Sequence, residues 1–95
     1  EMYYILEETE RISEYNKIVA SYRDGWLHLA IAMGDDLKLS NVFKAPDFVT
    51  AQYFLFLSLR QLQLNPQVST VYFRTPLGPE EKMSLYRYFN SVVVV

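Results

Sequence analysis

The end of the chain constrains the fold more than any other feature. It reads Ser91-Val92-Val93-Val94-Val95, four β-branched residues in a row with no charge and no turn. β-branched side chains pack well on a pleated surface, so the run predicts a strand. A strand that is apolar at every position is covered on both faces, as in parallel or mixed sheets flanked by helices. We therefore expect an α/β fold whose last strand is completed by material outside this segment.

The composition predicts one globular unit. Hydrophobic residues make up 51 % of the 95 residues, with eight Tyr and six Phe. A chain of this size buries roughly 60 to 65 % of its unfolded surface, which is enough for one core. We expect a single domain over residues 1–95, one half or a fragment of a larger protein, with a leading helix in 1–16 and the core in 17–95.

Residue types and charges exclude several classes of function. The absence of cysteine excludes thiolate catalysis, Cys-based zinc sites and disulfides. The chain has nine Lys and Arg against eleven Asp and Glu, and the basic residues do not cluster. Binding of nucleic acid needs a basic surface, which this charge pattern does not predict. No uncharged run, Phe48 to Leu59 included, reaches the ~20 residues that span a bilayer. We expect no nucleic-acid partner, no membrane span and a cytoplasmic location.

Three strands are predicted to form an antiparallel meander. Ile18–Tyr22 leads into the turn signal Arg23-Asp24-Gly25, and Trp26–Met33 leads into a second turn, Gly34-Asp35-Asp36. In the second and third strands apolar residues alternate with other residues, as in strands with one buried face. The residues that share the apolar side are Leu27, Leu29, Ile31 and Met33 in the second strand, and Leu37, Leu39, Asn41 and Phe43 in the third.

Two helices and two strands are predicted to follow. Pro46-Asp47 favours a helix start, and this helix extends to about Leu62, with Asn65-Pro66 beyond it. We then expect a strand from Val68 to Arg74. Pro79-Glu80-Glu81 favours a second helix up to about Asn90, and the valine strand comes after it. The residues expected on one face of this second helix are Met83, Tyr86 and Phe89.

The start of the chain has two competing interpretations. Met2–Ile12 has apolar residues at helical spacing and charges on the other side, which favours an amphipathic helix. Tyr3–Leu6 also suits a strand. We expect the helix.

From Ile18 onward this order resembles the ribonuclease H-like core, three antiparallel strands followed by αβαβ, which is also each half of the actin-like ATPase fold. It looks like an uncharacterised bacterial family with that fold, a domain of unknown function. The stretches that carry the likeness are Leu37–Phe43, Pro46-Asp47-Phe48, Tyr53–Phe56 and Leu62–Pro66. The resemblance implies an α/β subdomain with a mixed sheet of strand order 3-2-1-4-5 and right-handed crossover helices.

The resemblance also implies where a nucleotide would bind. Catalytic actin-like and sugar-kinase-like proteins carry an Asp-x-Gly-x-Gly-Thr type loop in the first hairpin, whose amides hold a phosphate. Here the turn reads Arg23-Asp24-Gly25-Trp26-Leu27, without the glycine pair or the hydroxyl. A structural hairpin is favoured, and Asp24 and Gly25 remain candidate cofactor-binding residues of a degenerate phosphate turn. We expect no cofactor, and ATP with magnesium is the alternative.

Other polar residues are better explained by structure than by chemistry. Asp35-Asp36 suits a solvent-exposed turn rather than a metal pair. His28 lacks a Ser, Asp or second His at a recognisable spacing, so packing is favoured over general-base catalysis. Asn41, on the apolar side of its strand, is expected to satisfy local backbone. We predict no catalytic residue and no metal ligand.

These expectations favour a non-catalytic protein-interaction or assembly scaffold. Its partner is another protein or the remaining half of the same protein, and a homo-oligomer is a further option. An ATP-binding protein whose nucleotide loops lie partly outside this segment is the alternative, and a metal-dependent nuclease is a weaker one. The sequence does not settle whether the protein is an enzyme, and the absence of a recognisable catalytic motif favours a non-enzyme.

Overall fold

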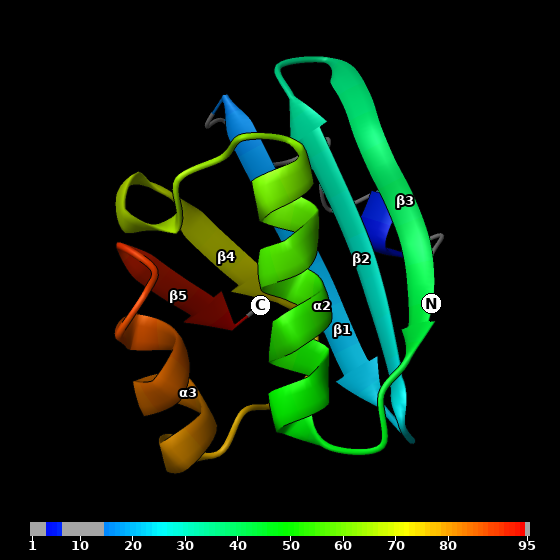
Figure 1. Cartoon of the computed structure of the whole chain (residues 1–95), viewed down its shortest axis with the longest axis vertical. Coiled ribbons are helices and arrows are strands. Elements are labelled where there is room, and N and C mark those ends of the chain that lie inside the picture. Colours follow the sequence, from blue (N-terminus) through cyan, green and yellow to red (C-terminus); the bar gives the residue numbers. More distant parts are fainter. Residues whose placement is uncertain (1–3, 7–14, 95) are drawn as a thin grey trace.

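The computed structural model describes residues 4–6 and 15–94 and contains a five-stranded mixed sheet in the order β3-β2-β1-β4-β5 (Figure 1). β1 pairs antiparallel with β2, and β2 with β3, while β1–β4 and β4–β5 are parallel. The predicted α/β class, meander and strand order are therefore confirmed. The elements are β1 (Asn16–Arg23), β2 (Trp26–Met33), β3 (Asp36–Lys44), α2 (Phe48–Gln61), the short 3₁₀ helix η1 (Pro66–Val68), β4 (Thr70–Phe73), α3 (Pro79–Tyr86) and β5 (Ser91–Val94).

One face of the sheet is covered by α2 and α3, which lie side by side in front of it in Figure 1. The core lies between these layers. Its centre is formed by Leu27, Leu29 and Ile31 of β2 against Leu55 and Leu59 of α2, all at most 1 % exposed. The alternation in β2 thus directs its large apolar side chains toward the helices, as predicted.

The opposite face of the sheet is covered, within the described residues, by the segment Tyr4–Leu6. These three residues are helical, so the competing strand interpretation is wrong for them. Ile5 is fully buried in a small cluster with Val19 of β1 and Ala30 of β2. The rest of the predicted helix Met2–Ile12 lies outside the described residues.

β3 departs from the predicted alternation because its pairing with β2 contains a bulge. Leu39 lies opposite Ile31, but the next pair joins Leu37 to Ala32 and leaves Lys38 as the extra residue. Residues directly opposite each other share a face. Leu37 therefore lies on the face of Ala32, at 48 % exposure, and not with Leu39 and Phe43 as predicted.

The C-terminal helix is shorter than predicted and buries a different face. α3 ends at Tyr86, and its buried residue is Leu85, whereas Met83 and Tyr86 are 65 % and 51 % exposed. Phe89 is buried only after the helix has ended, where its backbone N–H donates to the Leu85 carbonyl. The predicted face of Met83, Tyr86 and Phe89 is therefore wrong, because the chain turns before Phe89 can share a helical stripe with them.

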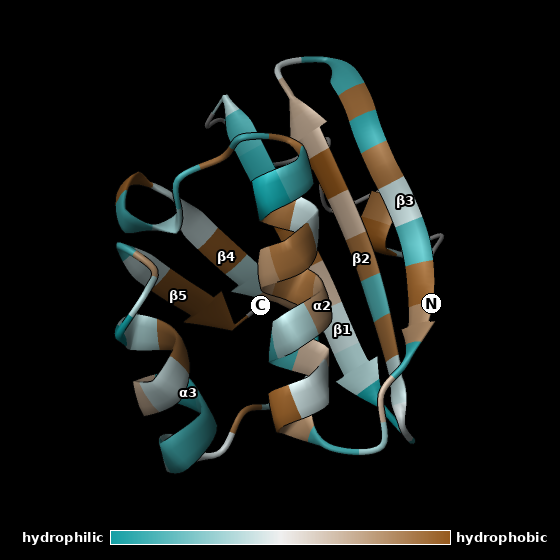
Figure 2. Ribbon diagram, in the orientation of Figure 1, coloured by the Kyte–Doolittle hydropathy of each residue, from teal (hydrophilic) through white to brown (hydrophobic). Residues whose placement is uncertain are grey.

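β4 and β5 are strands, as predicted, but two details differ from the prediction. Val68, predicted to begin a strand, ends η1 instead and is 74 % exposed. The valine run forms β5, coloured brown over most of its length in Figure 2. Val92 is buried, but Val94 is 38 % exposed because β5 lies at the edge of the sheet. Burial on both faces therefore does not hold along the whole described strand.

No helix among the described residues is long and apolar enough to cross a membrane.

Candidate functional site

The predicted phosphate turn is a two-residue hairpin between β1 and β2. Asp24 and Gly25 have φ values of 54° and 79°, and Arg23 pairs with Trp26 across the strands. Positive φ at both central residues is the geometry of a type I′ turn, whose twist matches that of the flanking strands. The Gly25 carbonyl accepts a hydrogen bond of 2.7 Å from the Ala45 N–H. The turn is thus tied to the connection between β3 and α2.

This hairpin lies where α/β folds commonly bind ligands. The strand order reverses between β1 and β4. Ligand sites occur at such switch points, outside the carboxyl ends of the parallel strands. Arg23 and Asp24 lie at the carboxyl end of β1, and Arg74 follows that of β4. A hollow of about 350 Å³ opens here, and its lining residues are Tyr4, Arg23, Asp24, Trp26 and His28.

The hollow combines aromatic and polar side chains. Trp26 is 44 % exposed, and the guanidinium of Arg74 lies 5.5 Å from the centre of the Tyr4 ring, a cation–π distance. The Nδ1 atom of His28 is buried without a hydrogen-bond partner among the described residues. The predicted candidates Asp24 and Gly25 thus lie in the same turn, and the structure adds Tyr4 and Arg23, which the sequence analysis did not single out.

The other polar residues considered in the sequence have local roles. Asp36 accepts a hydrogen bond of 2.9 Å from Lys38 Nζ, and this bond raises the pKa of Lys38. Asn41 Oδ1 accepts from the Val42 N–H at 2.8 Å, so its amide satisfies local backbone, as expected. Within residues 4–6 and 15–94, no three His, Asp or Glu side chains lie close enough together to hold a metal ion.

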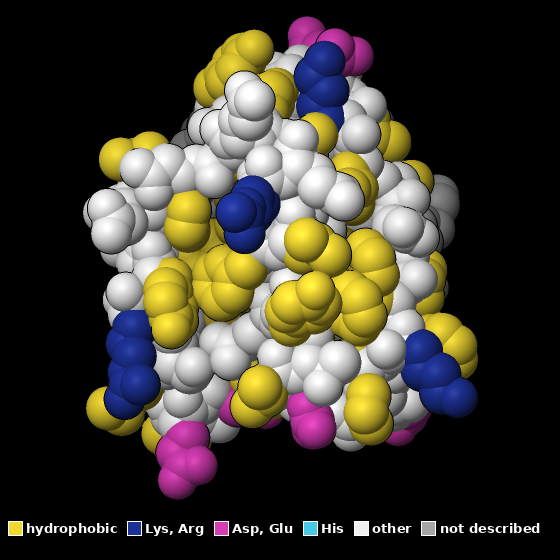
Figure 3. Space-filling model, viewed as in Figure 1, with side chains coloured by type: hydrophobic (Ala, Val, Ile, Leu, Met, Phe, Trp, Pro, Cys, Tyr) yellow, Lys and Arg dark blue, Asp and Glu magenta, His cyan; other side chains and the backbone are white. Residues whose placement is uncertain are grey.

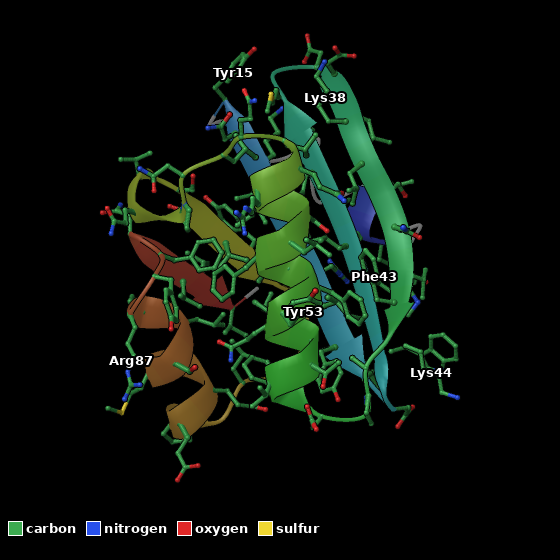
Figure 4. The ribbon with its side chains drawn as sticks, viewed as in Figure 1. Tyr15, Lys38, Phe43, Lys44, Tyr53 and Arg87 are labelled. Atoms are coloured by element: carbon green, nitrogen blue, oxygen red, sulfur yellow. The ribbon has the colours of Figure 1, made fainter. Side chains whose placement is uncertain are left out.

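A second candidate site, which the sequence analysis did not locate, lies on the outer face of α2. Hydrophobic side chains gather over this helix in Figure 3, and Tyr53 points outward from it in Figure 4. Val49 and Tyr53 are 74 % and 61 % exposed. A shallow hollow of about 210 Å³ is lined by Tyr53, Phe56, Leu57 and Arg60. We call Val49, Tyr53, Phe56, Leu57 and Arg60 the α2 ridge.

Contacts between rings hold the aromatic side chains of this region in place. Phe54 stacks on Phe43 of β3 at 4.8 Å between ring centroids and meets Tyr53 edge-on at 5.5 Å. On the other side, Phe56 meets Tyr88 edge-on at 4.8 Å and stacks with Phe89 at 5.6 Å. The α2 ridge is therefore supported by β3 on one side and by the segment after α3 on the other.

The start of α2 is fixed by two hydrogen bonds. Asp47 is its N-cap and accepts from the Thr50 N–H at 2.8 Å, which holds the pKa of Asp47 below its usual value. The Tyr22 hydroxyl donates to the Ala45 carbonyl at 2.8 Å. Burial, followed by the nearby charges of Asp47 and Glu81, raises the pKa of Tyr22. Tyr22 thus stays neutral and joins β1 to the connection before α2.

Comparison with solved structures decides the fold. The chain superposes on a Bacteroides thetaiotaomicron protein described as having an actin-like ATPase fold and unknown function, with a TM-score of 0.81 and 20 % sequence identity. This chain has an actin-like ATPase fold. The match confirms the resemblance to an uncharacterised bacterial protein with that fold, and at this identity it shows the fold alone. No protein-family model and no curated protein matches the chain.

The actin-like match is unequal in length. It covers 99 % of this chain but only 37 % of the Bacteroides protein. This chain therefore corresponds to a little over a third of that longer protein.

Proposed function

We propose that this chain is a non-catalytic protein-interaction module of an actin-like protein, and that it binds its partner through the α2 ridge. The observation that carries this proposal is the exposure of Val49 and Tyr53, at 74 % and 61 %, on a helix whose other side is buried in the core. Protein-binding surfaces are enriched in aromatic residues and Arg, and a few such anchors supply most of the binding energy.

The ring contacts beneath the ridge support this function. Phe56 contacts both Tyr88 and Phe89, and Tyr53 packs edge-on against Phe54. Side chains that are already ordered lose little conformational entropy when a partner binds. The α2 ridge therefore suits a rigid docking surface better than it suits a reaction, since within the ridge only Arg60 carries a charge.

The partner is a separate protein chain, either a different protein or a second copy of this one. A contact with another part of the same actin-like protein is the alternative. We propose a bacterial, cytoplasmic setting for this interaction, on the grounds that the similar structure comes from a bacterium.

Site-specific photo-crosslinking in the native host cells tests the docking function. Tyr53 is replaced by photoreactive benzoyl-phenylalanine, with Val68, which is 74 % exposed outside the ridge, as the matched control position. We expect a discrete protein adduct from position 53, none from position 68, and loss of the adduct when Leu57→Ser is added. Mass spectrometry identifies the bound protein. No adduct at position 53, or the same adducts at both positions, would contradict the proposal.

ATP binding is the alternative function, and one observation favours it. The hollow of about 350 Å³ beside Asp24 lies at the switch point of the sheet, the usual ligand position in α/β folds. Against it, the turn lacks the glycine pair and the hydroxyl of a phosphate loop, and the side chain after Gly25 is the large Trp26. The metal-dependent nuclease, the weaker alternative, has no supporting site among the described residues, because no suitable acidic cluster lies among them.

A thermal shift with ATP and magnesium separates the two functions. A ligand that binds only the folded state raises the melting temperature in a saturable way. We expect no saturable shift for the interaction module. A saturable shift that is lost in the Asp24→Asn variant would overturn the non-catalytic proposal in favour of ATP binding.

A further inference from the structure

The α2 ridge has the spacing of a helix-pairing seam. Val49, Tyr53, Phe56 and Arg60 follow one another at intervals of about four, three and four residues, the repeat by which helices pack side by side in coiled coils. Val49, Tyr53 and Arg60 are exposed, and Phe56 between them is partly buried against Tyr88 and Phe89. The buried residues of α2 are Ala51, Leu55, Ser58 and Leu59. The helix thus has one side for the core and a second side suited to another helix.

We propose that the partner of the α2 ridge is a second copy of this chain, with the two α2 helices antiparallel across a two-fold axis. This inference rests on the proposed docking function. α2 runs from Phe48 to Gln61, and the midpoint of the seam, between Tyr53 and Phe56, coincides with the midpoint of the helix. An antiparallel copy therefore aligns over the whole helix, with Tyr53 opposite Phe56 of the other copy.

The charges at the two ends of α2 favour the antiparallel arrangement. The acidic N-cap Asp47 begins the helix, and Arg60 lies in its last turn. Antiparallel pairing brings the acidic end of each helix to the basic end of the other, and it also aligns the two helix dipoles favourably. A parallel pair would place like charges together. The small net charge of −2 adds little repulsion between copies.

The pairing is self-complementary, which is the requirement for a two-fold dimer. In such an interface the same surface serves both copies, so each contact occurs twice. The ridge meets this condition because its apolar centre, Tyr53 and Phe56, is flanked by Val49 on one side and Arg60 on the other. Each Val49 then lies opposite an Arg60, whose aliphatic stem can pack against it.

Sedimentation of the purified chain tests the dimer. We expect a concentration-dependent monomer–dimer equilibrium whose dissociation constant rises about tenfold or more in Tyr53→Ser, because central aromatic anchors dominate such interfaces. Val68→Ser is the matched control, since Val68 is exposed but lies outside α2, and it should leave the equilibrium unchanged. Circular dichroism confirms that both variants are folded. A monomer at all concentrations, or a dimer unaffected by Tyr53→Ser, overturns the inference.

Cysteine pairing tests the direction of the helices, because the natural chain has no cysteine. Under mild oxidation, a mixture of Val49→Cys and Arg60→Cys chains should form a disulfide-linked dimer, whereas Val49→Cys alone should not. A linked dimer from Val49→Cys alone overturns the antiparallel arrangement. If the chain is monomeric while photo-crosslinking at position 53 captures a different protein in a Leu57-dependent way, the self-association fails and the docking function stands. If neither sedimentation nor photo-crosslinking detects a contact, the self-association and the docking function are both contradicted.

Discussion

The two faces of the sheet are covered in different ways. On one face, two helices bury a large cluster that includes Leu29, Leu55 and Phe73, all at most 1 % exposed. On the other, the described cover is the helical segment Tyr4–Leu6, and the buried cluster there is Ile5, Val19 and Ala30. Hydrophobic stabilisation scales with apolar area removed from water. The helix-covered face should therefore dominate the stability of the fold.

The comparison also shows where function can develop. The helix-covered face carries the α2 ridge on its outside, supported by a well-packed core. The opposite face carries the hollow beside Asp24, which Tyr4 of the short segment helps to line. The proposed docking surface thus lies on the helix-covered face, and the hollow beside Asp24 is lined in part by the segment that covers the other face.

The largest expected effect is in the large cluster. Leu55→Ala should lower the free energy of unfolding by about 2–5 kcal/mol, because it removes a buried side chain and leaves a cavity between α2 and the sheet. Urea denaturation measures the loss. Gln61→Ala, at an exposed position of the same helix, is the control and should change the stability by less than about 0.5 kcal/mol. A loss in Leu55→Ala no larger than in this control would break the comparison.

A smaller effect is expected in the small cluster. Ile5→Ala should cost about 2 kcal/mol, the lower end for such truncations, because a short segment can relax toward the sheet and fill part of the cavity. The same urea titration applies, with Ser40→Ala, an exposed site on this face opposite Ala30, as the control. If Ile5→Ala costs as much as Leu55→Ala, the two faces contribute equally and the comparison is wrong.

The smallest expected effect is on the pH dependence of the stability, through Asp47, the N-cap of α2. The pKa of Asp47 is lowered from its usual value of 3.8, chiefly by the backbone hydrogen bond from Thr50. A lowered folded-state pKa contributes stability above the unfolded value and loses it as the pH falls through the folded value. Asp47→Asn keeps a capping oxygen but no charge, so it should be slightly less stable than the natural chain at pH 7.

Urea denaturation of both chains from pH 7 down to pH 2 measures this difference. The gap between the natural chain and Asp47→Asn should close as the pH falls below 3.8, because protonation removes the charge from Asp47. A gap that stays constant over this range would show that the charge contributes nothing to the cap.

Local patterns predicted the elements of this protein well. The turn Asp24-Gly25, the alternation in β2 and the helix start at Asp47 each depend on residues close together in the sequence, and each occurs as predicted. Asp24 and Gly25 stay candidate cofactor-binding residues. The sequence could not show that Tyr4 lines the hollow beside Asp24, because Tyr4 comes from a segment distant in sequence. The α2 ridge was not predicted, because the exposure of Val49 and Tyr53 depends on how α2 packs on the sheet.

The sequence by itself determined the α/β class and the meander, because turn chemistry and hydrophobic periodicity are properties of short segments. The strand order was implied by the resemblance to the ribonuclease H-like core, and the sheet has that order. Only the tertiary structure decided which side chains are buried in β3, α3 and β5. The bulge at Lys38 places Leu37 on the other face, α3 buries Leu85 and leaves Met83 exposed, and the position of β5 at the sheet edge exposes Val94. Each outcome depends on which distant segment packs against the element. The hydrophobic periodicity of an element does not identify that segment.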